Sequence, residues 1–154
     1  MTTATRLRSA LLVGGVAAGT LLTGAPPASA AAVCDGDYVR TCINLRQTSD
    51  YYVAASASIR DTDLGSDYAV GVQNVTLQIK RGGQWEFFDY VARDRDGLHD
   101  VSDAVSDGGF SCSGYGTAVL RAKATMRWQR AGSATVTTEY VYSTTVGIPC
   151  WNGG

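Results

Sequence analysis

Apolar and polar residues alternate along much of this chain, a pattern typical of β-strands that bury one face. The clearest run spans residues 117–130. Its apolar positions are Ala118, Leu120, Ala122, Ala124, Met126 and Trp128, and its polar positions include Arg121, Lys123, Thr125, Arg127 and Gln129. Further strands are predicted at 51–60, 68–81, 85–92 and 135–146, with short candidates at 98–101 and 104–105.

The phase of the alternation changes inside the 68–81 run. Val70 and Val72 have one parity, whereas Val75 and Leu77 have the other. A bulge between Gly71 and Asn74 would reset the phase, because an extra residue shifts later side chains to the other face. The alternative is that both faces of this strand are covered.

Tight turns separate these runs, and the chain after residue 30 has no apolar stripe with helical spacing. Long strands with one apolar face and one solvent-exposed polar face are typical of antiparallel sheets. About seven strands in this length predict a single all-β domain over 31–154, an antiparallel immunoglobulin-like sandwich, with a small closed barrel as the alternative.

The first 30 residues predict a signal peptide. Two arginines precede a 13-residue apolar run, Ala10–Leu22, and the motif Ala28-Ser29-Ala30 follows. The run is shorter than the roughly 20 residues that a membrane span needs, so the alternative is an interfacial helix or an anchor. We therefore expect cleavage after Ala30, a secreted extracellular protein, and no membrane span in the mature chain.

Four cysteines lie in the predicted mature chain. An even number in an exported protein indicates disulfides, and four cysteines allow three pairings. The short first spacing favours Cys34–Cys42, which would close a hairpin around Asp35-Gly36-Asp37, and leaves Cys112–Cys150. The Cys-x2-Cys spacing of a zinc site is absent from the sequence.

Charge and residue inventory exclude several functions. The mature chain keeps 11 basic and 14 acidic residues. It lacks the excess of basic residues that is typical of nucleic-acid-binding domains. His99 is the sole histidine, and no Gly-x-Ser-x-Gly motif accompanies it. Because the cysteines are expected to be paired, a thiol nucleophile is also missing. We predict that the protein is not an enzyme.

An aspartate-rich segment is the one candidate metal site. Asp94, Asp96 and Asp100 are the candidate calcium ligands, with Asp103 and Asp107 close behind. Asp94-Arg95-Asp96-Gly97 resembles part of a calcium loop, although the later ligands of an EF-hand are missing. The alternative is a solvated acidic loop whose carboxylates pair with neighbouring arginines. No other cofactor is predicted.

Aromatic and basic side chains supply the candidate binding surface. Trp128 is in phase with core positions, and so are Trp85 and Phe87. Phe88, Tyr90, Tyr140 and Tyr142 either form an exposed aromatic patch or cover the second sheet face. The row Arg121, Lys123 and Arg127 would meet an acidic partner or polysaccharide, or be a solvated face.

These features favour a secreted, non-enzymatic binding module for an extracellular protein or glycan. One alternative is a protease inhibitor that presents residues 108–116, around Cys112, and another is carbohydrate or cell-wall binding. In general architecture the chain resembles exported bacterial immunoglobulin-like proteins, and that resemblance carries over no functional residue.

Overall fold

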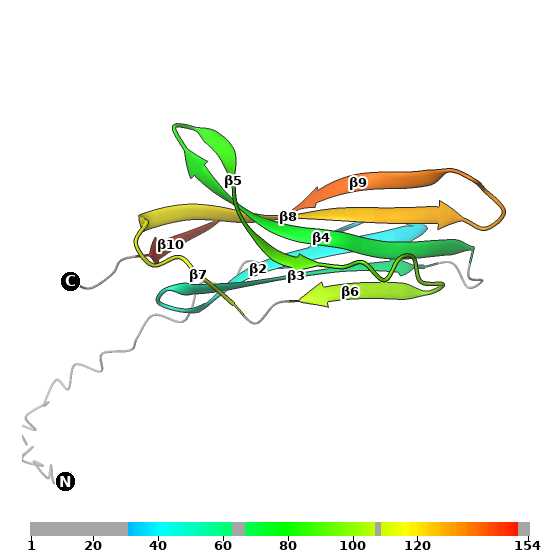
Figure 1. The fold of residues 1–154 in the computed structure, drawn as a ribbon, viewed down its shortest axis with the longest axis horizontal. Coiled ribbons are helices and arrows are strands. Elements are labelled where there is room, and N and C mark those ends of the chain that lie inside the picture. Colours follow the sequence, from blue (N-terminus) through cyan, green and yellow to red (C-terminus); the bar gives the residue numbers. More distant parts are fainter. Residues whose placement is uncertain (1–30, 63–66, 107–108, 151–154) are drawn as a thin grey trace, which may run out of the picture.

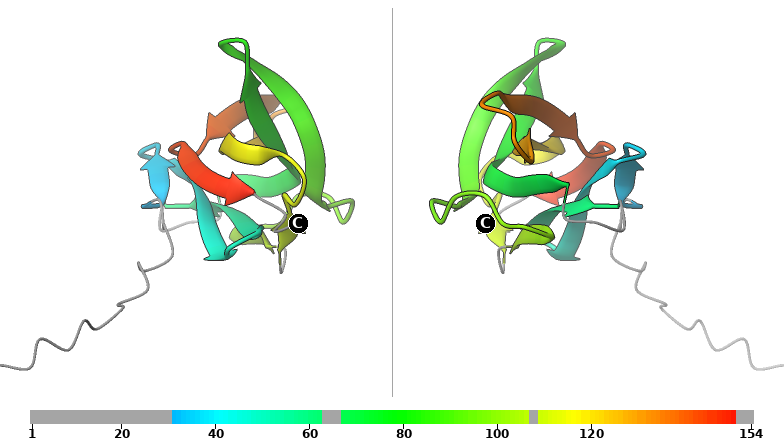
Figure 2. Two further views of the ribbon diagram at one scale, coloured as in Figure 1. Left: turned by 90° about the vertical axis from the view of Figure 1, so that its left-hand side faces the viewer. Right: turned by 90° about the vertical axis from the view of Figure 1, so that its right-hand side faces the viewer.

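A computed structural model describes residues 31–62, 67–106 and 109–150 of the chain. Within these residues the chain forms ten strands in two antiparallel sheets that pack face to face (Figures 1 and 2). None of the described residues forms a helix long and apolar enough to cross a membrane. The predicted signal peptide, Asp107, Gly108 and Trp151 lie outside the described residues.

The first sheet has the order β1-β2-β3-β6, and β7 also pairs with β3. Its strands are β1 (Val33–Asp35), β2 (Val39–Ser49), β3 (Tyr52–Asp61), β6 (Ser102–Ser106) and β7 (Phe110–Ser111). The second sheet has the order β10-β8-β4-β5, and β9 also pairs with β8. Its strands are β4 (Tyr68–Arg81), β5 (Gln84–Arg93), β8 (Gly116–Arg130), β9 (Val136–Tyr142) and β10 (Val146–Cys150).

The core lies between the sheets and is built by the alternation seen in the sequence. Leu45 and Ile59 from the first sheet meet Leu77, Leu120 and Met126 from the second, and all five side chains are fully buried. Each such side chain stabilises the fold by roughly 1.5–3 kcal/mol relative to exposure. The predicted sandwich is confirmed, and the closed-barrel alternative is wrong.

The bulge predicted in the fourth strand is confirmed. The pairing of β4 with β8 shifts register between Val72 and Asn74. As a result Val70 and Val72 before the bulge, and Val75 and Leu77 after it, are all buried.

Other strands differ from the prediction. The run at 135–146 is broken at Ser143, so β9 and β10 pair with successive parts of β8. Residues 98–101 do not form a strand, and only a single bridge joins His99 to Val70. The predicted N-terminal hairpin is present, but its second strand, β2, continues to Ser49.

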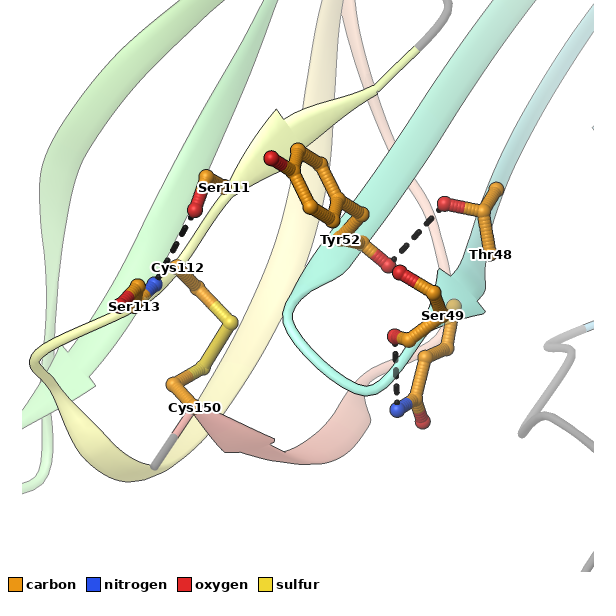
Figure 3. Close-up of a disulfide and its surroundings, with 8 residues drawn as sticks. Thr48, Ser49, Tyr52, Ser111, Cys112, Ser113 and Cys150 are labelled. Carbon is orange, nitrogen blue, oxygen red and sulfur yellow. Dashed lines mark hydrogen bonds between the residues drawn. A yellow bond between two sulfur atoms is a disulfide. The ribbon is translucent and has the colours of Figure 1, made fainter. Parts of the chain in front are cut away.

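Both predicted disulfides are present. Cys34 and Cys42 are direct partners in the β1–β2 pair. Cys112 and Cys150 are fully buried and join the segment after β7 to the end of β10, which links the two sheets (Figure 3). Backbone hydrogen bonds support this link, because the Cys112 N–H donates to the Tyr51 carbonyl at 2.8 Å.

Candidate binding face on the second sheet

The outer face of the second sheet is centred on β8. Leu120 and Ala122 are buried between the sheets, so the side chains of Arg121 and Lys123 point outward from the sandwich. Arg127 follows on the same side, and all three basic residues are half-buried. The basic row expected from the sequence therefore lies on a single exposed face.

A bulge in β5 decides which aromatic rings reach this face. Phe87 pairs with Gln78 and Tyr90 pairs with Thr76, so the two β5 residues between them face only one residue of β4. Phe87 and Tyr90 are both exposed, and their ring centroids lie 5.1 Å apart. The bulge thus brings two rings of opposite sequence parity to the same face.

The pairing of β5 with β4 corrects two sequence-based predictions. Phe87 is 58% exposed, so its assignment to the core is wrong. Phe88 instead packs against the core, with its ring centroid 4.9 Å from that of Phe110 and 4.7 Å from that of Tyr115. Phe88 is therefore removed from the candidate patch, because its side chain points away from the outer face.

Aromatic residues also flank β8 on its other side. Tyr140 and Tyr142 of β9 pair with Thr125 and Lys123 of β8, and they are 56% and 38% exposed. With Tyr90, three of the four aromatic residues proposed from the sequence are exposed on the outer face. Two strands, β4 and β8, lie between the rings of β5 and those of β9, and the three strand spacings give a width of roughly 14 Å.

Arg121 joins the two aromatic groups. Its guanidinium carbon lies 4.2 Å from the ring centroid of Trp85 and 4.3 Å from that of Tyr142. Its Nε–H donates to Gln78 Oε1 at 2.8 Å. The planar cation is therefore held between two rings from β5 and β9.

Two further cations lie over rings of this face. The Lys123 ammonium is 3.9 Å from the ring centroid of Tyr140, and the Arg93 guanidinium is 3.6 Å from that of Tyr90. We call the set Arg93, Arg121, Lys123, Trp85, Phe87, Tyr90, Tyr140 and Tyr142 the cation–aromatic face. The sequence contained no signal for Trp85 or Phe87 as members, because their exposure depends on the β5 hairpin and its bulge.

The cation–aromatic face contains three basic side chains and no carboxylate. The outward positions of β4, β8 and β9, all within the described ranges, contain no Asp or Glu. Glu139 pairs with the buried Met126 and so lies on the other side of β9. Asp89 sits in the β5 bulge, where its carboxylate accepts a hydrogen bond from the Tyr90 N–H at 2.7 Å.

The aspartate-rich loop converges on a different set of ligands from the one predicted. In the described part of the chain, the one set of at least three acidic, thiol or imidazole groups whose ligand atoms all lie within 4.8 Å of one another is Asp96, His99 and Asp103. Asp94 accepts a hydrogen bond from the Asp96 N–H at 3.0 Å, and Asp100 is not in the converging set. Calcium prefers oxygen ligands, and the observed set includes the imidazole nitrogen of His99. Calcium binding by Asp94, Asp96 and Asp100 stays a prediction.

This loop is docked on the start of β4. His99 exchanges two backbone hydrogen bonds of 2.8 Å with Val70, and the Asp103 carboxylate accepts the Val72 N–H at 2.6 Å. A Cβ on Gly71 would come within 2.5 Å of the Gly97 carbonyl oxygen, so only glycine allows this approach. His99 Nε2 lies 3.0 Å from the Asp96 carboxylate, so a carboxylate rather than a serine hydroxyl contacts the imidazole.

The described part of the segment proposed as an inhibitor loop, 109–116, is held by strand pairing and by a backbone hydrogen bond. Phe110 and Ser111 pair with β3, and the Gly114 N–H donates to the Cys150 carbonyl at 3.1 Å. Gly114 and Gly116 both have positive φ. Residues 113–115 form the turn between β7 and β8, and protease inhibition by this segment stays a prediction. Comparison with known proteins adds no relative, because no protein-family model and no curated protein matches the chain.

Proposed function

We propose that this protein is an exported, non-catalytic module that binds an extracellular glycan through the cation–aromatic face. Export is supported by the N-terminal sequence and by the two disulfides, which form in oxidising compartments. The immunoglobulin-like assignment belongs to this proposal too, as a scaffold that presents a ligand-binding sheet.

One observation carries the proposal. Phe87, Tyr90, Tyr140 and Tyr142 are exposed on one sheet face, on both sides of a basic row. Exposed aromatic rings are unfavourable in water, and they offer apolar platforms on which the C–H faces of sugar rings pack. The neighbouring amide and cationic groups supply hydrogen-bond donors for sugar hydroxyls.

The test is a pull-down with insoluble glycans, followed by affinity measurements on soluble fragments of those that bind. We expect the double variant Tyr140→Ala/Tyr142→Ala to bind at least about tenfold more weakly, since exposed aromatic side chains often dominate the affinity of a binding surface. Tyr38→Ala is the matched control, because Tyr38 is 63% exposed at the start of the first sheet.

The control should bind within about twofold of the unmodified protein. Absence of binding to every glycan tested, or an equal loss in the control, would contradict the proposed function. Thermal melting of each variant shows whether a loss of binding reflects loss of the fold.

A further inference from the structure

We propose that the glycan is anionic, and that Arg121 is the anchor of a subsite for an oxyanion carried on the sugar chain, a carboxylate or a sulfate. This inference rests on the proposed function and names the chemistry of its ligand. It is carried by the contacts of Arg121 and by the charge distribution of the face.

The guanidinium of Arg121 is fixed before any ligand arrives. Trp85 and Tyr142 hold it from two sides, at 4.2 and 4.3 Å, and Gln78 accepts the hydrogen bond from its Nε–H. Among the described residues, no hydrogen bond or ion pair uses its two terminal nitrogens. These nitrogens form the edge of the guanidinium that binds carboxylates and tetrahedral oxyanions through two parallel hydrogen bonds.

An arginine held this way differs from an ordinary surface arginine. A free side chain of this type loses considerable rotamer entropy when it binds a ligand. Arg121 has already lost this freedom to the rings and to Gln78, so anion binding restricts it little further. Since Arg121 is half-buried, water also screens its charge less than that of a fully exposed cation.

The surrounding charges favour an anionic partner. Lys123 neighbours Arg121 on the outward side of β8, and Lys80 lies 5.9 Å from the ring centroid of Trp85. No acidic residue shares the outward positions of β4, β8 and β9 within the described ranges. These cations therefore form a local positive patch on a mature chain with 11 basic and 14 acidic residues.

The same charge balance favours a glycan over a nucleic acid. Domains that bind nucleic acid are usually basic overall, whereas this mature chain is acidic overall. Bases of single-stranded nucleic acid could stack on the same rings, so oligo-deoxythymidine is included in the test as the competing ligand.

The experiment compares charged polymers with their neutral counterparts. Polygalacturonate is paired with its methyl ester, and dextran sulfate is paired with dextran. We expect the protein to bind at least one charged polymer about tenfold or more tightly than its neutral partner at low salt, with affinity falling as salt rises.

Variants then locate the anion. Arg121→Gln should remove most of the preference for the charged polymer. Arg121→Lys should restore only part of it, because an ammonium lacks the planar fork. Arg46→Gln is the matched control, since Arg46 is an exposed arginine on β2 of the first sheet, and it should bind within about twofold of the unmodified protein.

Three results would overturn the inference: equal affinity for charged and neutral polymers, an unchanged preference in Arg121→Gln, or tighter binding of oligo-deoxythymidine than of either charged polymer. Binding of neutral glycans that depends on Tyr140 and Tyr142 would refute the anionic ligand alone. Failure to bind any glycan would refute the proposed function as well.

Discussion

His99 shows how strongly its neighbours set the chemistry of one side chain. Its Nε2 lies 3.0 Å from the Asp96 carboxylate, and Asp103 and Asp94 add negative charge nearby. The hydrogen bond to Asp96 raises the pKa of His99 above its ordinary value, and this effect outweighs the opposing effect of desolvation. The sequence places His99 close to several aspartates, but it did not identify Asp96 as the partner.

We expect the imidazole of His99 to titrate above pH 6.5 in NMR spectra, where it gives the sole histidine signal of the chain. The Asp96→Asn variant should lower this midpoint, whereas Asp50→Asn, in the β2–β3 turn, should leave it unchanged. Because the folded-state pKa of His99 is raised, the contact stabilises the fold fully below pH 6.5, as long as Asp96, whose pKa is lowered, stays ionised. The stabilisation is then lost as pH rises through the folded-state pKa. A midpoint at or below 6.5 in the unmodified protein would contradict this assignment.

At the scale of elements, irregularities in the strands decide which residues reach the surface. The β4 bulge keeps both phases of that strand in the core, and the β5 bulge exposes Tyr90 beside Phe87. A third irregularity separates β9 from β10 at Ser143, which is 7% exposed. Its Oγ accepts the Ala122 N–H at 2.9 Å and donates to the Thr144 carbonyl at 2.8 Å.

The Ser143→Ala variant should lower the free energy of unfolding by about 1–3 kcal/mol, because the buried Ala122 N–H loses its acceptor. Urea denaturation monitored by tryptophan fluorescence measures the change. Ser102→Ala is the control, since Ser102 is exposed on β6, and it should alter stability by at most about 0.5 kcal/mol. An equal effect in the two variants would show that the Ser143 hydroxyl does not stabilise the break between β9 and β10.

At the scale of the whole molecule, two layers are joined by a shared core and by one buried disulfide. Cys112 follows a strand of the first sheet, and Cys150 ends a strand of the second (Figure 3). Cys34–Cys42, by contrast, joins adjacent strands of one sheet and spans 8 residues of sequence, compared with 38 for the inter-sheet bond.

Removal of the inter-sheet disulfide should therefore be the more damaging change. The chain-entropy model assigns about 4 kcal/mol to the longer loop and about 2.5 kcal/mol to the shorter one. The double variants Cys112→Ala/Cys150→Ala and Cys34→Ala/Cys42→Ala test this order by urea denaturation under non-reducing conditions. A larger loss for the Cys34–Cys42 pair would contradict the model.

Much of the scaffold follows from local sequence patterns. The alternation in 117–130 predicts which face of β8 is buried, because side chains of a strand alternate in direction wherever it pairs. The short spacing between Cys34 and Cys42 likewise favours the observed pairing. The outward row of Arg121, Lys123 and Arg127 could therefore be predicted from the sequence alone.

The cation–aromatic face, in contrast, was decided by the tertiary structure. The register of β5 on β4 turns Phe87 outward and Phe88 toward the core, and two extra residues in β5 change the phase after Phe87, which strict alternation cannot predict. Arg121 meets Trp85 and Tyr142 only because β5, β4, β8 and β9 lie side by side in a particular register. Strand order and register depend on contacts between residues far apart in the chain, so no local pattern of the sequence contains them.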